Sequence, residues 1–379
     1  MFSDKHNREI YERLHSKLQK RKEIGIYREL QVSKGLVDFC SNDYLGLARN
    51  RELYLLVQKE LAFLAEDLPS GSTGSRLLTG NHDYNMELEN KFADLFEAEA
   101  SLIFNSGYVA NTALMSCVAD RTDTIIYDEL IHASIKEGYR LSFAKRYPFA
   151  HNDLNDLEKK LNKAEGEKFV VVESVYSMDG DAAPLQAIAK LCDDYNANLI
   201  LDEAHSTGLW GKGGSGIACQ LNIEDAFFAR IYTFGKAIGS HGACVVGNQV
   251  LKDYLINFAQ GLIYTTALPI HTLVSVSNAF DYLAENMHLQ QKMHQVVTKF
   301  GQAVQNSRYD VVPNESPIQV IKVRDAKKAK DLAYKLQRNG LDVRAIVSPT
   351  VRAGEERLRI CLHVYNTDSD IDHLASLIG

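Results

Sequence analysis

The chain has 379 residues, of which 45% are hydrophobic and 24% are charged, a composition typical of a globular protein with a sizeable core and about two domains. It carries 42 lysines and arginines against 49 acidic residues, a formal net charge of -7, without long runs of one sign. This excludes the extended basic surface with which proteins bind nucleic acid or anionic membranes, and favours a small-molecule substrate.

The cysteines and the N-terminus bear on the cellular compartment. The six cysteines are scattered without a Cys-x-x-Cys pair, so we expect neither a metal site nor a disulfide framework: Cys40, Cys117, Cys192, Cys219, Cys244 and Cys361. Residues 1–23 are charged with a helical pattern and lack the apolar core of a signal peptide, and no apolar run approaches the length of a membrane span. We therefore expect a cytoplasmic protein.

In chain order, short apolar runs bounded by turn residues alternate with amphipathic segments. The expected strands are 101–104, 124–127, 169–174, 198–202, 230–234 and 243–247. The expected helices around them are 84–96, 111–119, 133–142, 154–164 and 184–195. This alternation predicts an α/β fold in which helices cover a mainly parallel sheet.

The C-terminal part has a different pattern. A long helical stretch is followed by a strand (318–323), a helix (325–340), two strands (342–347 and 357–363) and a last helix, which predicts a small α+β domain. We divide the chain into an N-terminal helix and segment that pack on the small domain, a large domain, a linking helix and the small domain: 1–45, 46–270, 271–305 and 306–379.

The stretch TFGKAIGSHGACVVG, residues 233–247, is mostly small and apolar but contains Lys236. One interpretation is a lysine at a strand end whose amine reaches solvent while its stem packs on apolar neighbours. The other is a nucleophile, because desolvation or nearby positive charge lowers the pKa of a lysine and frees its amine for Schiff-base chemistry. This stretch alone leaves both open.

The stretch NLILDEAHSTG places Asp202 at the end of an apolar strand, the position where ligands bind in open α/β sheets. Buried Asp and His side chains need partners. Asp202 could cap the next helix and His205 could be a hydrogen-bonded core histidine. Alternatively, the Asp202 carboxylate could hold a protonated ring nitrogen.

A lysine for an aldehyde, a carboxylate for a ring nitrogen and backbone amides for a phosphate are what pyridoxal 5'-phosphate requires. In FNSGYVANTAL, residues Ser106, Gly107 and Tyr108 join a strand to a helix, so their N–H groups can face an anion. His132 begins a helix and could stack on the pyridine ring, although a histidine there is often a surface residue. Ser177 follows a strand in the turn YSMDGD, which ordinary turn hydrogen bonds could also explain.

The order of the motifs SNDYLGL, FNSGYVAN, HAS, YSMDGD, LDEAHSTG and TFGKAIGS resembles the α-oxoamine synthases. These are fold-type I pyridoxal phosphate enzymes that condense an amino acid with an acyl thioester and release carbon dioxide. The resemblance extends from about Gly25 to the C-terminus. The segments 149–158, 261–269 and 345–363 are most similar to the branch that joins L-alanine to a pimeloyl thioester in biotin biosynthesis, with the acyl group on coenzyme A or on an acyl carrier protein.

The resemblance implies a homodimer and a role for each matched position. The catalytic residues would be Lys236, which carries the cofactor and removes the alanine Cα proton, with Asp202 on the ring nitrogen, His205 on the ring hydroxyl and His132 stacked on the ring. The other cofactor contacts would be Ser177, Ser106, Gly107, Tyr108, Thr233 and, from the neighbouring subunit, Thr266. The substrate contacts would be Asn42, Arg359 for the amino acid carboxylate, and Arg28 and Arg352 toward the distal end of the acyl chain.

Three other interpretations remain open. The first is another member of the same family: 2-amino-3-ketobutyrate CoA ligase, which uses glycine and acetyl-CoA, or more distantly serine palmitoyltransferase or 5-aminolevulinate synthase. The second is a pyridoxal-dependent aminotransferase or lyase, which would share Lys236 and Asp202 but need no thioester. The third is a non-catalytic subunit of a synthase heterodimer, against which the presence of Lys236 argues directly.

Overall fold

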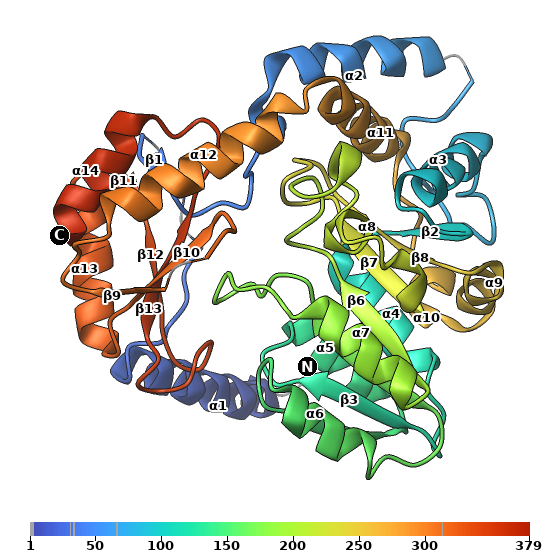
Figure 1. Ribbon diagram of the computed structural model, residues 1–379, viewed down its shortest axis with the longest axis horizontal. Coiled ribbons are helices and arrows are strands. Elements are labelled where there is room, and N and C mark those ends of the chain that lie inside the picture. The colour runs from blue at the N-terminus through green and yellow to red at the C-terminus, as the bar shows by residue number, and fades with distance from the viewer. Residues whose placement is uncertain (1–3, 31, 33–34, 66, 313) are drawn as a thin grey trace.

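A large twisted sheet organises the right half of the molecule in Figure 1. The structure is a computed structural model that describes residues 4–30, 32, 35–65, 67–312 and 314–379. In this part of the chain the large sheet has seven strands in the order β2-β8-β7-β6-β5-β3-β4. They are β2 (Ala100–Phe104), β3 (Thr124–Asp128), β4 (Lys145–Phe149), β5 (Lys168–Glu173), β6 (Ala197–Asp202), β7 (Ala229–Thr233) and β8 (Ala243–Gly247). β8 alone runs opposite to the other six strands, so the predicted mainly parallel sheet is confirmed.

Helices alternate with these strands and cover the sheet. They are α3 (Asp83–Leu95), α4 (Gly107–Cys117), α5 (Ala133–Leu141), α6 (Leu154–Leu161), α7 (Leu185–Asp194), α8 (Ile217–Gln220), α9 (Gln249–Phe258) and α10 (Gln260–Ile263), with the short 3-10 turns η2 (Lys212–Gly214) and η3 (Glu224–Ala226). Because β3, β5, β6 and β7 are parallel, their last residues lie along one edge of the sheet. Asp128, Glu173, Asp202 and Thr233 are these last residues, so the edge is rich in polar side chains.

The C-terminal part forms a separate antiparallel sheet, drawn in orange and red on the left of Figure 1. Its order is β12-β13-β10-β9, with β9 (Asp310–Val312), β10 (Ile318–Lys322), β12 (Arg344–Ile346) and β13 (Arg357–Cys361). The helices α13 (Ala326–Arg338) and α14 (Asp368–Ile378) accompany it. The N-terminal segment joins this part, since β1 (Val37–Asp38) pairs in parallel with β11 (Leu341–Asp342). The preceding helix is α1 (Asp4–Glu23), and η1 (Leu47–Arg49) and α2 (Arg51–Leu64) follow.

The stretch predicted as one linking helix forms two helices, α11 (Ile270–Glu285) and α12 (His288–Ala303). Asn286 ends the first helix, because its side-chain amide donates to the carbonyl of Tyr282 and its backbone N–H donates to that of Leu283. The apolar periodicity continues across the break, which is why the sequence pattern did not indicate it. The four domain boundaries stay predictions.

Three strands, β1, β4 and β9, were not predicted from the apolar pattern. Four of the five residues of β4 are exposed and the strand contains Pro148, as befits the edge of a sheet. The short β9 likewise lies at an edge of its sheet, and none of its residues is fully buried. Edge strands lack a two-sided apolar environment, so their sequences carry little hydrophobic signal.

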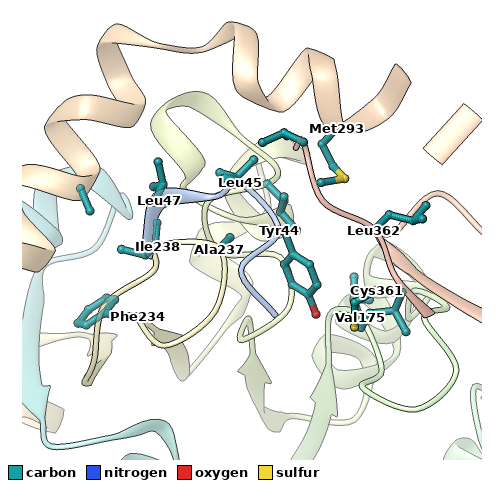
Figure 2. Close-up of a cluster of buried hydrophobic side chains, with 14 of the residues drawn as sticks. Tyr44, Leu45, Leu47, Val175, Phe234, Ala237, Ile238, Met293, Cys361 and Leu362 are labelled. Carbon is teal, nitrogen blue, oxygen red and sulfur yellow. The ribbon is translucent and has the colours of Figure 1, made fainter. Parts of the chain in front are cut away.

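Apolar side chains attach the N-terminal segment to the loop that follows β7. Figure 2 shows Leu45 and Leu47 of this segment close to Phe234, Ala237 and Ile238, and all five are buried. Close approach of the two backbones requires a glycine in the loop. A Cβ atom on Gly239, whose φ is +66°, would lie 2.3 Å from the backbone nitrogen of Ala48. This packing against the N-terminal segment therefore fixes the loop that carries Lys236.

Two further findings bear on the composition. Among the residues that the structure describes, no helix combines the length and the apolar character needed to cross a membrane. All six cysteines are free thiols.

Candidate active site

A cavity of about 210 Å³ lies at the carboxyl edge of the large sheet. It is lined by Asn42, Ser106, Gly107, Tyr108, Asn111, His132, Ser134, Glu173, Asp202, Ala204, Thr233, Gly235, Lys236, His241 and Gly242. The structure thus brings together most of the residues that the sequence singled out for the cofactor, from segments as far apart as the N-terminal segment and the loop after β7.

Lys236 faces the cavity rather than bulk solvent. The backbone N–H of Gly239 donates to its carbonyl at 2.8 Å, which closes the turn after β7. Burial lowers the pKa of its amine to about 8, although the carboxyl groups of Asp202 and Glu173 act in the opposite direction and raise it. Roughly a tenth of the amine is therefore unprotonated at pH 7, far more than for an ordinary lysine, and this is the form that a nucleophile or base requires. Of the two interpretations of Lys236, the geometry favours the nucleophile.

Asp202 ends β6 with its carboxylate almost fully buried. Its Oδ1 accepts from the backbone N–H of Ala204 at 2.9 Å and its Oδ2 accepts from Nδ2 of Asn111 at 2.7 Å. The bond to Ala204 is the turn contact expected of a structural aspartate. A carboxylate oxygen can accept more than one hydrogen bond, so Asp202 can also take the N–H of a ring that enters the cavity.

Glu173 is a second carboxyl group beside Asp202 that the sequence analysis missed. The two residues are register partners in adjacent strands, β5 and β6. Oε1 of Glu173 is buried without a hydrogen-bond partner among the described residues, although the side chain lines the cavity. Burial, followed by the charge of Asp202, raises the pKa of Glu173 to about 8. Glu173 is therefore largely protonated at neutral pH and does not add a full second negative charge to the cavity.

The first turn of α4 presents backbone N–H groups to the cavity. Ser106 is the N-cap, and its Oγ accepts from the N–H of Val109 at 3.2 Å. A Cβ atom on Gly107 would lie 2.4 Å from Cγ2 of Thr233, so no side chain fits at this position. A helix N-terminus with a close, unobstructed backbone suits a phosphate group.

His132 is held in a fixed orientation at the N-terminus of α5. Its Nδ1 lies 2.7 Å from Oγ of Ser134, and that oxygen accepts from Nδ2 of Asn111 at 3.1 Å. Burial, assisted by the charge of Lys236, lowers the pKa of His132, so the imidazole is neutral. Asn111 therefore connects the carboxylate of Asp202 with the residue that orients His132.

A second network lies beside the cavity, between the N-terminal segment and β13. Arg359 donates from Nε to the carbonyl of Ser177 at 2.6 Å and from Nη2 to Oδ1 of Asn42 at 3.0 Å. The Tyr44 hydroxyl lies 3.1 Å from the same Oδ1 and 2.8 Å from Nδ1 of His205. Burial holds the pKa of His205 well below its usual range. A fixed guanidinium next to a cavity can receive a substrate carboxylate.

Six of the predicted contacts lie outside the cavity lining. Two of them, His205 and Arg359, belong to the second network, and the other four are Ser177, Arg28, Arg352 and Thr266. Ser177 reaches the site through its backbone carbonyl. Arg28 is exposed, and Arg352 pairs with Glu129 at 2.6 Å. The carbonyl of Thr266 accepts from Asn105, the residue before the α4 N-cap, while Thr266 itself is exposed. The roles assigned to these residues toward substrate and toward a second subunit stay predictions.

The residues that the sequence analysis missed are those that hold others in place. Asn111 lies one helical turn after Gly107 on α4, a spacing that could have pointed to the cavity. Glu173 is the last residue of a buried strand, as Asp202 is. Tyr44 and Ser134 carry no such signal, because their roles depend on partners that only the folded chain provides.

Comparisons with known proteins agree with this geometry. Residues 34–378 match the family model for aminotransferase class I and II. The chain is 39% identical to an 8-amino-7-oxononanoate synthase from Emericella nidulans, over 97% of this chain and 94% of that protein. It is 36% identical to 8-amino-7-oxononanoate synthase 2 from Bacillus subtilis, over 95% of both chains.

Solved structures show the same fold. An 8-amino-7-oxononanoate synthase from Francisella tularensis aligns with a TM-score of 0.79 and 30% identity, over 91% of this chain and 97% of that one. A serine palmitoyltransferase variant from S. paucimobilis with a bound PLP–myriocin aldimine aligns with a TM-score of 0.87 and 25% identity, over 98% and 96%. The fold-type I architecture is therefore confirmed. The chain belongs to the aminotransferase class I and II family and, within its α-oxoamine synthases, to the 8-amino-7-oxononanoate synthases.

Proposed function

We propose that the protein condenses L-alanine with a pimeloyl thioester and releases 8-amino-7-oxononanoate, carbon dioxide and the free thiol, a step of biotin biosynthesis. The observation that carries the chemistry is the cavity itself, in which the amine of Lys236 has a pKa of about 8 and faces the carboxylate of Asp202. Sequence identity supports this branch of the family over the palmitoyltransferase branch. The chain is 39% and 36% identical to two 8-amino-7-oxononanoate synthases and 25% identical to a serine palmitoyltransferase.

The residues of the cavity fit pyridoxal 5'-phosphate. Lys236 would hold its aldehyde, Asp202 its ring nitrogen and the N-terminus of α4 its phosphate, because each offers the matching group at the cavity wall. His132 would lie against the ring face. When bound, this cofactor supplies an electron sink for the carbon next to the amino group.

The chain's own groups then bind the amino acid and move its proton. Arg359 and Asn42 would orient the alanine carboxylate, since the guanidinium is held in position by Ser177 before any substrate arrives. The unprotonated amine of Lys236 would remove the Cα proton of alanine. The neutral imidazole of His132 would not compete with Arg359 for the carboxylate charge.

A thiol-release assay tests the proposal with two amino acids and a series of acyl-CoA donors, and mass spectrometry of the product confirms the bond formed. We expect L-alanine with pimeloyl-CoA to release thiol far faster than glycine with acetyl-CoA. Equal or faster turnover of glycine and acetyl-CoA would favour the ligase instead, and a preference for long monocarboxylic chains would favour the palmitoyltransferase branch.

Three further parts of the proposal concern the setting of the reaction. We propose a homodimer in which Thr266 of each chain contributes to the phosphate site of the other.

Delivery of the acyl group by coenzyme A or by an acyl carrier protein is distinguished by offering both donors in the same assay. A cytoplasmic location fits the scattered free cysteines.

A further inference from the structure

Tyr44 connects two parts of the site to which we have assigned different tasks. Its ring is 0% exposed, and Figure 2 shows its hydroxyl pointing away from Leu45 and Leu47. The hydroxyl oxygen lies 3.1 Å from Oδ1 of Asn42 and 2.8 Å from Nδ1 of His205. Tyr44 therefore touches both the carboxylate-binding pair and the histidine on the cofactor side.

The protons in this network can be counted. A tyrosine hydroxyl has one proton, an amide oxygen only accepts, and a neutral imidazole carries one N–H. Burial raises the pKa of Tyr44 and lowers that of His205, so the hydroxyl keeps its proton and the imidazole is neutral. Oδ1 of Asn42 already accepts from Arg359 at 3.0 Å, which fixes the orientation of its amide.

Two arrangements satisfy this count. If Tyr44 donates to Asn42, His205 must carry its proton on Nδ1 and donate to the Tyr44 oxygen, and Nε2 is then a bare acceptor. If Tyr44 donates to Nδ1 instead, Nε2 of His205 carries the proton and becomes a donor. No side chain or backbone group in the described chain pairs with Nε2 of His205. The direction in which the Tyr44 hydroxyl donates therefore decides whether Nε2 is a hydrogen-bond donor or an acceptor.

We propose that Tyr44 is a positioning residue that sets the tautomer of His205: with the cofactor bound it donates to Nδ1, so that Nε2–H of His205 faces the ring oxygen. The inference rests on the proposed function, because the ring oxygen of pyridoxal phosphate is the group that Nε2 would meet. An oxygen with negative charge requires a donor, and a bare nitrogen there would repel it. When the Tyr44 hydroxyl donates to His205, Oδ1 of Asn42 accepts only from Arg359. The single Tyr44 proton therefore serves either the carboxylate-binding pair or the histidine that contacts the ring.

Nitrogen-15 NMR of histidine-labelled protein measures the tautomer directly, with the His205 signals assigned by their loss in His205→Gln. In wild-type protein loaded with pyridoxal phosphate we expect Nε2 protonated and Nδ1 unprotonated. Without cofactor we expect both tautomers. In loaded Tyr44→Phe the ring oxygen still requires the N–H on Nε2, but Nδ1 has lost its donor. The dissociation constant of the cofactor in equilibrium dialysis should therefore rise about tenfold, as for one lost hydrogen bond.

Asn42→Ala is the opposing variant, because it removes the competing acceptor. We expect its His205 to carry the proton on Nε2 even without cofactor, and this measurement also decides the question should Tyr44→Phe fail to fold. Tyr232→Phe is the matched control: Tyr232 is equally buried and its hydroxyl accepts from Nη1 of Arg230 at 2.8 Å. It should leave the His205 signals and the cofactor affinity at the wild-type values.

Two outcomes would overturn the inference. One is a loaded wild-type protein whose His205 carries its proton on Nδ1. The other is a folded Tyr44→Phe variant with the cofactor affinity of wild type. A wild-type protein that binds no pyridoxal phosphate would instead refute the proposed function. In that case an unchanged tautomer in cofactor-free Asn42→Ala would also reject the role of Tyr44.

Discussion

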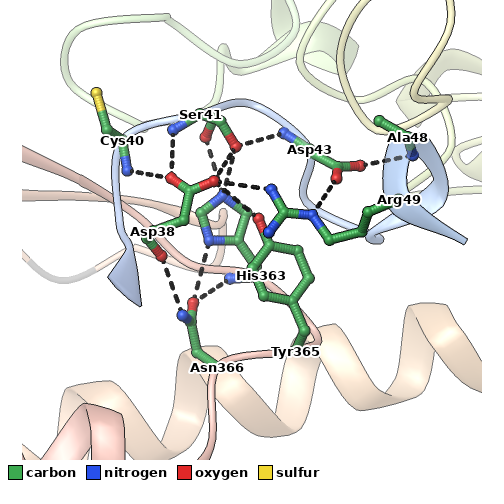
Figure 3. Close-up of polar contacts among 9 residues, drawn as sticks. All are labelled: Asp38, Cys40, Ser41, Asp43, Ala48, Arg49, His363, Tyr365 and Asn366. Carbon is green, nitrogen blue, oxygen red and sulfur yellow. Dashed lines mark hydrogen bonds and ion pairs between the residues drawn. The ribbon is translucent and has the colours of Figure 1, made fainter. Parts of the chain in front are cut away.

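Two polar regions meet at Asn42 and differ in how completely their hydrogen bonds are satisfied. On one side is the cavity, where the amine of Lys236 is desolvated and Oε1 of Glu173 has no partner among the described residues. On the other side is the seam between the N-terminal segment and the chain after β13. Figure 3 shows the seam, which consists of Asp38, Cys40, Ser41, Asp43, Ala48, Arg49, His363, Tyr365 and Asn366.

The carboxylate of Asp38 is the centre of the seam. It accepts from the backbone N–H groups of Cys40 and Ser41, from the Ser41 hydroxyl, from Nη2 of Arg49 and from the Tyr365 hydroxyl, all within 2.7 to 3.0 Å. Its own carbonyl accepts from Nδ2 of Asn366 at 3.0 Å. Burial alone would raise the pKa of Asp38, but these donors outweigh it and hold the pKa well below its usual range.

The contrast separates stabilising from functional polar groups. A buried polar atom without a partner costs about 1 to 3 kcal/mol, so a fold tolerates one where a ligand completes the pairing. The seam fixes the backbone on both sides of Asn42, and the cavity leaves its groups available. Substitutions in the cavity should therefore abolish activity with little loss of stability, whereas substitutions in the seam should mainly reduce stability.

Lys236→Ala is the largest expected effect. We expect turnover to fall about 10⁴-fold or more, because the nucleophile and the base are lost together. The visible absorbance given by added pyridoxal phosphate should disappear with it. The melting temperature should not fall, since the substitution removes a desolvated amine. Lys59→Ala, at an exposed position of α2, is the control. Borohydride labelling of a lysine other than Lys236 would contradict the assignment.

Asp202→Asn should have the next largest effect on turnover. An amide can keep the contact to the N–H of Ala204 but cannot hold a ring nitrogen protonated, so we expect the cofactor to bind and the reaction to slow about 10³-fold. Deuterium exchange at the alanine Cα measures the step concerned. Exchange at the wild-type rate would rule out this role for Asp202 and would leave it as a structural turn residue.

Asp38→Asn tests the other side of the comparison. The amide cannot accept all the donors around it, so we expect a loss of about 2 to 4 kcal/mol in the free energy of unfolding, with the KM of the remaining activity little changed. Because the pKa of Asp38 is lowered, its contribution is fully present above the unfolded value of about 4 and is lost as the pH falls below it. Denaturant unfolding should show a smaller difference in the free energy of unfolding between Asp38→Asn and wild type at low pH than at pH 7.

The sequence predicts the two regions unequally. Lys236, Asp202 and His132 could be predicted because each lies at the end of a strand of the parallel sheet or in the turn after it, and the edge where such strands end is known in advance. Tyr44 could not, since His205 is 161 residues away in sequence and their contact depends on how the N-terminal segment packs. The break at Asn286 was missed because hydrophobic periodicity persists across it. The role of Thr266 depends on a second chain, which spacing along one chain does not place.

His151 lies between two carboxylates, those of Asp128 and Asp181, at the rim of the large sheet. Its Nδ1 lies 3.0 Å from both carboxylate oxygens of Asp128, and its Nε2 lies 2.7 Å from Oδ2 of Asp181. Burial alone would lower the pKa of His151, but these bonds raise it to about 10. The contribution to stability is therefore full below the unfolded value of about 6.5 and is lost as the pH rises toward 10. We expect His151→Asn to lose about 2 kcal/mol at pH 6 and progressively less at higher pH, measured by denaturant unfolding.

The smallest expected effect concerns Arg352, whose ion pair with Glu129 joins the loop before β13 to the turn before His132. The Arg352 side chain is 75% exposed, so Arg352→Met should change stability by less than about 1 kcal/mol. If Arg352 binds the distal carboxylate of the acyl chain, this variant raises the KM for pimeloyl-CoA and leaves that for alanine unchanged. Glu129→Gln then lowers the KM for pimeloyl-CoA, because it removes the competing carboxylate. If the ion pair instead only holds the loop in place, both substitutions raise that KM alike, and the acyl-chain role predicted for Arg352 is wrong.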